Sequence, residues 1–83
     1  MKYNEDPIMF AKELRQEGHV KKFSIKERGP DGWEVREEQD DRVLKQICYT
    51  DWHRVERALN MFNLQIDELE GLGWNSQGYS LKR

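Results

Sequence analysis

The chain has little cysteine and no long apolar run. One cysteine among 83 residues cannot form an internal disulfide, which excludes a disulfide-stapled scaffold. No apolar stretch approaches the roughly 20 residues that a membrane-spanning helix needs, so we expect no membrane association. The start of the chain also lacks a cationic and then apolar signal peptide. Together these absences lead us to expect a cytoplasmic protein.

The chain also lacks an excess of basic residues. Its net charge is -2 and its pI is about 5.7, which argues against binding nucleic acid through overall charge. Hydrophobic residues make up 36% of the chain and charged residues another 36%, with three tryptophans, three phenylalanines and three tyrosines to fill the core. A chain of this size buries roughly 60 to 65% of its unfolded surface, so we expect one small domain.

The N-terminal segment has the start and stop signals of a helix. Asp6 precedes Pro7, which fits an N-cap followed by proline at the first helical position, where no N–H is needed. Apolar residues then recur at helical spacing: Ile8, Ala11 and Leu14. Gly18 fits the position after a helix end. We therefore expect a helix over residues 7–17.

From Val20 the apolar spacing changes from about 3.6 to about 2, which is typical of half-buried strands. Phe23 and Ile25 share one face, as do Trp33 and Val35. We expect strands over residues 20–28, 32–39 and 42–50, joined by the turns "GPDG", whose second glycine can take a positive φ, and "QDDR". The last strand has apolar residues on both faces, so we expect it to be central or covered on both sides.

The longest expected element is a second helix. It begins with Thr50 or Asp51 as its cap and ends near Leu69 or Leu72. Its apolar stripe has the spacings 3, 4, 3, 4 and 3: Trp52, Val55, Leu59, Phe62, Ile66 and Leu69. The following segment has no period, so we expect a loose tail from which Trp74 packs back onto the domain.

These elements combine into an α+β fold. We expect a three-stranded antiparallel sheet, a β-meander, with an N-terminal helix and a long C-terminal helix in the order αβββα. The stripe of the second helix then packs on one face of the sheet. Residues 1–74 form a single compact domain and residues 75–83 a flexible tail.

Polar and reactive residues crowd the strand–helix junction "YTDWHRVERALNMF", residues 49–62. Cys48 and His53 suggest a thiol nucleophile, since an imidazole can activate a thiolate, but no signature residues accompany them. As a metal site, Cys48, His53 and Glu56 offer three ligands where structural zinc takes four. The acidic residues 34–41 contain no glycine turn of the kind that calcium loops use. We therefore expect no enzyme, catalytic residue, metal, cofactor or small-molecule substrate.

A basic group on the sheet predicts an alternative function. Lys22, Lys26, Arg28 and Arg36 are expected on its open face, where they would bind nucleic acid. The expected element order resembles that of double-stranded RNA-binding domains, which implies such a partner. The lysine-rich helix start of those domains is absent from "TDWHRVERAL", and the acidic second strand would lie beside the lysines.

The outer side of the second helix predicts a protein partner. At about 100° per residue, Met61 and Leu64 fall far from the core stripe, with Arg57 beside them. Single exposed leucines also occur on ordinary solvated faces. We expect a small non-enzymatic protein-interaction module that self-associates through this helix, most simply as a homodimer about a two-fold axis. Nucleic-acid binding is the less favoured alternative.

Overall fold

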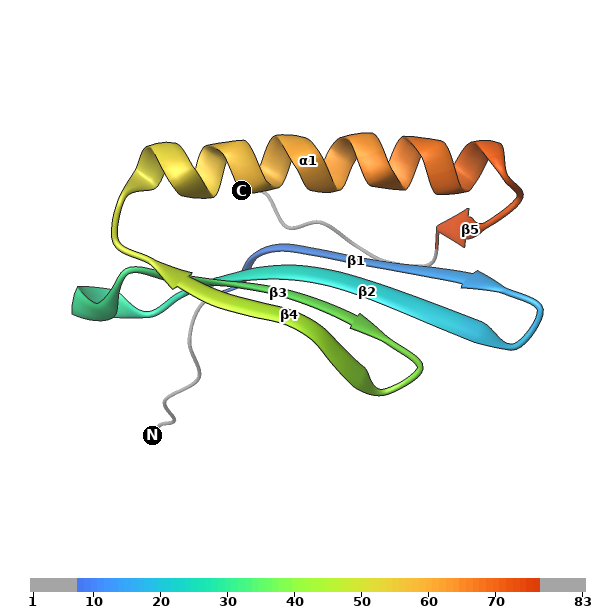
Figure 1. The fold of residues 1–83 in the computed structure, drawn as a ribbon, viewed down its shortest axis with the longest axis horizontal. Coiled ribbons are helices and arrows are strands. Elements are labelled where there is room, and N and C mark those ends of the chain that lie inside the picture. The colour runs from blue at the N-terminus through green and yellow to red at the C-terminus, as the bar shows by residue number, and fades with distance from the viewer. Residues whose placement is uncertain (1–7, 77–83) are drawn as a thin grey trace.

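The computed structural model describes residues 8–76 and shows an antiparallel sheet with a long helix across one of its faces (Figure 1). The elements are β1 (Ile8–Gln16), β2 (His19–Glu27), a 3-10 turn (Gly29–Asp31), β3 (Trp33–Gln39), β4 (Arg42–Tyr49), α1 (Trp52–Gly71) and β5 (Asn75–Ser76). The five strands lie in the order β4-β3-β2-β1-β5. The class is α+β, as expected, but the order of the elements differs from the expected αβββα.

The predicted N-terminal helix is wrong, because residues 8–16 form strand β1. Phe10 and Leu14 are four residues apart, a spacing that places them on one face of a helix and equally on one face of a strand. Glu17 and Gly18 both have positive φ, at 49° and 82°, so Gly18 serves a tight two-residue hairpin rather than a helix end. Pairing with β2 then makes β1 an inner strand of the sheet.

The predicted three-stranded sheet is corrected to five strands, and β4 is not central. The expected strands 20–28, 32–39 and 42–50 correspond to β2, β3 and β4. Within residues 8–76, β4 pairs only with β3 and forms one edge of the sheet. Val43, Leu44 and Ile47 are 45%, 53% and 38% exposed. Apolar residues on both faces of β4 therefore mark exposed apolar surface rather than burial on both sides.

The core lies between α1 and the helix-facing side of the sheet. Its buried apolar residues are Leu14, Phe23, Ile25, Val35, Val55, Phe62 and Ile66. The rings of Phe23 and Phe62 are 4.8 Å apart at their centroids, and those of Trp33 and Trp52 are 5.3 Å apart. The predicted packing of the apolar stripe on β2 and β3 is confirmed.

The start of α1 follows a local sequence signal. The Asp51 side chain accepts a hydrogen bond from the His53 N–H at 3.0 Å, which satisfies one of the free donors of the first turn. Trp74 packs against the core, as expected. Asn75 and Ser76, expected in a loose tail, pair with Arg15 and Leu14 as strand β5. The tail prediction for residues 77–83 lies outside the described residues.

Helix α1 is 20 residues long, but charged and polar residues occupy the faces of the helix outside its apolar stripe. No helix in residues 8–76 combines the length and the apolar composition that crossing a membrane requires.

Candidate functional site

The outer face of α1 carries a stripe of four exposed side chains, called here the outer stripe: Arg57, Met61, Leu64 and Glu68. Their spacings of 4, 3 and 4 residues place them side by side on one face of the helix. Met61 is 51% exposed and Leu64 is 63% exposed. The predicted placement of both apolar residues away from the core is confirmed.

The charged ends of the outer stripe have no ionic partner in the part of the chain that the structure describes. Among residues 8–76, neither Arg57 nor Glu68 forms an ion pair. The stripe therefore presents a free cation at one end, two apolar side chains in the middle and a free carboxylate at the other end.

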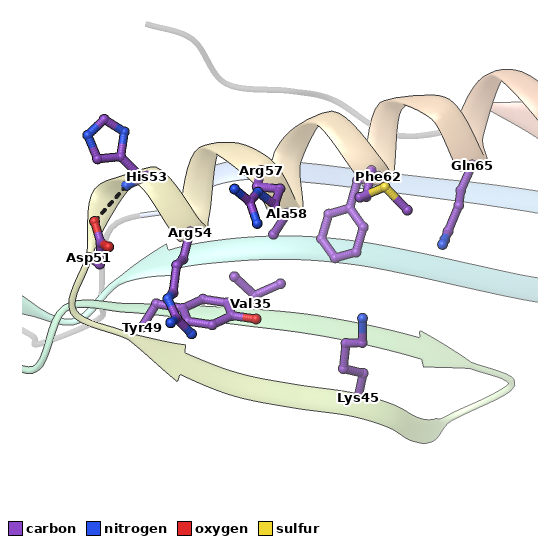
Figure 2. Close-up of a pocket in the computed structure, with 11 residues that line it drawn as sticks. Val35, Lys45, Tyr49, Asp51, His53, Arg54, Arg57, Ala58, Phe62 and Gln65 are labelled. Atoms are coloured by element: carbon purple, nitrogen blue, oxygen red, sulfur yellow. Dashed lines mark hydrogen bonds between the residues drawn. The ribbon is translucent and has the colours of Figure 1, made fainter.

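A second feature lies between α1 and strand β4, and Figure 2 shows it in close-up. This β4–α1 groove has a volume of about 470 Å³. Its apolar wall includes Val35, Phe62 and Met61, and Tyr49 and Lys45 border it from β4. The groove lies where α1 leaves part of the helix-facing side of β4 open: Ile47 is 38% exposed, whereas Tyr49 at the end of the strand packs against the core.

The charges around the β4–α1 groove are unbalanced. Lys45, Arg54 and Arg57 line it, and among the described residues none of these three cations forms an ion pair. Lys45 lies opposite Glu37 in the sheet register, but the Glu37 carboxylate is 3.6 Å from Lys21 Nζ instead. The groove is thus cationic in a chain whose net charge is -2.

The acidic side chain at the groove is already engaged. Asp51 caps the first turn of α1 through its bond with the His53 N–H, which Figure 2 marks with a dashed line. It therefore holds the helix end rather than neutralising the arginines.

The open face of the sheet differs from the groove in its charge pairing. Arg28 Nη1 is 2.9 Å from Glu34 Oε1, and Arg36 Nε is 3.2 Å from Glu38 Oε2. The other two candidate cations lie in register with acids: Lys22 with Glu38 and Glu13, and Lys26 with Glu34. Nucleic-acid binding through Lys22, Lys26, Arg28 and Arg36 stays a prediction, and these acidic neighbours weigh against it.

The analogy with double-stranded RNA-binding domains loses its basis, because β1 replaces the expected first helix. That order of elements was the reason for the resemblance.

Glu34 is the buried polar side chain of the described region, at 4% exposure. Its two oxygens accept hydrogen bonds from Arg28 and from Gln46. Both bonds link β3 to neighbouring segments, so the burial of this carboxylate is compensated. Glu34 belongs to the packing of the sheet and not to a reactive site.

The thiol and imidazole of the strand–helix junction lie on different sides of the sheet. Cys48 is exposed and in register with Glu34, on the face opposite α1. His53 lines the β4–α1 groove, on the helix side. The fold does not bring this thiol and this imidazole together. In residues 8–76, no three His, Cys, Asp or Glu side chains gather in a way that could hold a metal ion.

Two of the residues that define these surfaces were not singled out from the sequence. Glu68 continues the spacing from Arg57 through Met61 and Leu64, so a search for charge at both ends of that stripe would have found it. Lys45 had no such signal. Its position in the groove depends on β4 being an edge strand, which only the sheet order decides.

Comparisons of the chain with protein-family models, with curated proteins and with solved structures give no match.

Proposed function

We propose that this protein is a small protein-interaction module that self-associates through the outer stripe of α1. The observation that supports the proposal is the self-complementarity of the stripe. If two copies pack with their helices antiparallel about a two-fold axis at the middle of the stripe, Met61 of each copy meets Leu64 of the other. Arg57 of each copy then meets Glu68 of the other. Such an isologous contact uses the same surface twice.

The two kinds of contact contribute differently to the proposed dimer. The four apolar side chains lose water on association, which supplies the favourable free energy. The two Arg57–Glu68 pairs fix the antiparallel orientation, because a parallel arrangement would place like charges together. A helix pair of this kind has axes roughly 8 to 10 Å apart, so Met61 and Leu64 are long enough to touch across it.

Static light scattering at micromolar to millimolar concentration tests the proposal. We expect the wild-type chain to dimerise and Leu64→Glu to shift the equilibrium to monomer, because the substitution buries a carboxylate in an apolar contact. Asn63→Glu is the matched control, since Asn63 is also exposed on α1 but lies outside the stripe. It should leave the dimer intact.

A charge swap tests the orientation. Arg57→Glu should weaken the dimer by placing two carboxylates together, and the double variant Arg57→Glu with Glu68→Arg should restore it. A wild-type chain that stays monomeric over the whole concentration range would refute self-association. A dimer that neither Leu64→Glu nor Arg57→Glu weakens would place the contact elsewhere.

A further inference from the structure

The free edge of β4 and the cationic groove beside it form a second surface, which shares Arg57 and Met61 with the outer stripe but does not include Leu64 or Glu68. We propose that the β4–α1 groove binds an extended, acidic polypeptide segment, which pairs with the edge of β4 as an additional strand. This proposal does not require self-association.

The edge of β4 supplies backbone groups for such a strand. β4 has eight residues and, within residues 8–76, no neighbour on its outer side. The register between β3 and β4 shifts between Glu37 and Glu38, so the regular part of β4 runs from residue 45 to residue 49. An added strand lies roughly 4.8 Å away and pairs through main-chain hydrogen bonds. This requirement favours a polypeptide over a nucleic acid.

The side chains above the edge select the chemistry of the added strand. Along β4, Lys45, Ile47 and Tyr49 face the side of the sheet that α1 covers, and Figure 2 shows Lys45 and Arg54 between the strand and the helix. Ile47 is 38% exposed and can cover an apolar side chain of the added strand. The flanking cations can pair with acidic side chains two residues before and after it. The fitting segment alternates acidic, apolar and acidic residues on its helix-facing side.

A second copy of this chain is a poor occupant of the same edge. A two-fold axis that pairs two β4 strands antiparallel must be perpendicular to the sheet, so both helices lie on the same face. The two cationic grooves would then face each other with Lys45, Arg54 and Arg57 doubled, and like charges brought together oppose association. The unbalanced charge therefore points to a partner with acidic residues.

Fluorescence anisotropy with short labelled peptides tests this proposal on the full chain. The probe is the heptapeptide Thr-Glu-Thr-Val-Thr-Glu-Thr, which carries glutamates on either side of a valine on one strand face. Two control peptides replace both glutamates with lysine or the central threonines with proline, which cannot donate to the strand ladder. We expect the acidic peptide to bind with an affinity that falls as salt rises, and both controls to bind at least about tenfold more weakly.

Protein variants locate the site. Lys45→Glu and Arg54→Glu should each weaken binding of the acidic peptide by about tenfold or more. Lys26→Glu on the opposite face and Leu64→Glu on the outer stripe should leave it unchanged. Because Leu64→Glu removes the proposed dimer contact, peptide binding by this variant separates the two proposals.

Three results would overturn the proposal: no binding of the acidic peptide, equal binding of the acidic and lysine peptides, or equal binding of the proline peptide. Displacement of the peptide by single-stranded oligothymidine, with tighter binding of the oligonucleotide at Lys45 and Arg54, would assign the groove to nucleic acid instead. The comparison among peptides uses the wild-type chain, so it stays decisive even if a variant fails to fold.

Discussion

Glycine is required at position 32 for two reasons: the backbone conformation there, and the atoms packed against it. Its φ is 90°, in the region that favours glycine, and a Cβ at this position would overlap the carbonyl oxygen of Tyr49 and contact Thr50. The residue thus allows the end of β4 to pass close to the turn before β3. Only backbone atoms lie in the way, so a larger residue cannot be accommodated by a side-chain rotation.

We expect Gly32→Ala to lower the free energy of unfolding by more than about 1 kcal/mol, because strain and overlap add. Gly18→Ala is the matched control, since Gly18 also has a positive φ of 82° but has open space around the added methyl group. Urea unfolding of both variants measures the difference. If both variants lose the same free energy of unfolding, backbone strain alone accounts for the loss, and the overlap with Tyr49 is relieved by a small shift.

Asp40 anchors the turn between β3 and β4. The Val20 N–H donates to its Oδ1 at 2.8 Å, and His19 Nδ1 is 2.9 Å from its Oδ2. The backbone N–H of Val20, and then the His19 side chain, hold the pKa of Asp40 below its ordinary value of 3.8. Because the folded pKa is the lower one, the carboxylate stabilises the fold above pH 3.8, and this contribution disappears as the pH falls through the folded pKa.

Asp40→Asn should therefore be less stable than wild type at neutral pH, and the difference should narrow as the pH falls below 3.8. Asparagine tolerates the positive φ of 51° at this position, so the turn itself is kept. Urea unfolding at a series of pH values measures both chains. Asp41→Asn in the same turn is the control, and a difference between wild type and Asp40→Asn that is independent of pH would contradict the assignment.

At the scale of elements, β1 decides the architecture of the sheet. Leu14 is fully buried in the middle of the core, although the surrounding segment "AKELRQE" is largely polar and made of good helix formers. Local propensity favours a helix here, and the hairpin at Glu17 and Gly18 together with pairing to β2 favours a strand. The tertiary contacts win, because β1 pairs with β2 and β5 on its two sides and Leu14 is buried in the core.

Leu14→Ala should destabilise the protein by about 2 to 5 kcal/mol, through lost burial and the cavity left behind. The total stability of a small domain is about 5 to 15 kcal/mol, so this loss is a large share. Leu44→Ala in β4 is the matched control, since Leu44 is 53% exposed, and it should change stability by less than about 0.5 kcal/mol. Urea unfolding midpoints measure both. A loss at Leu14 no larger than at Leu44 would contradict its place in the core.

At the scale of the whole molecule, charged side chains are arranged differently on the two sides of the sheet. The open face of the sheet carries cations beside carboxylates. On the helix side, next to β4, lie Lys45, Arg54 and Arg57, which form no ion pair with any residue in 8–76. Of the cations that the sequence suggested for nucleic-acid binding, Arg28 and Arg36 form ion pairs, and Lys22 and Lys26 lie beside acids in the sheet register. Lys45, which the sequence did not single out, forms no ion pair within the described residues. A count of charge along the chain cannot distinguish these cases, because pairing depends on which strands are neighbours.

The sequence by itself determined what depends on neighbouring residues along the chain. A cap at Thr50 or Asp51, the stripe of α1, the alternation in β2 and β3 and the placement of Met61 and Leu64 all follow from spacings of a few residues. The tertiary structure alone decided that residues 8–16 are a strand and that β4 is an edge. Those outcomes depend on competition between distant segments for hydrogen bonds and burial, and a spacing such as that of Phe10 and Leu14 satisfies a helix and a strand equally.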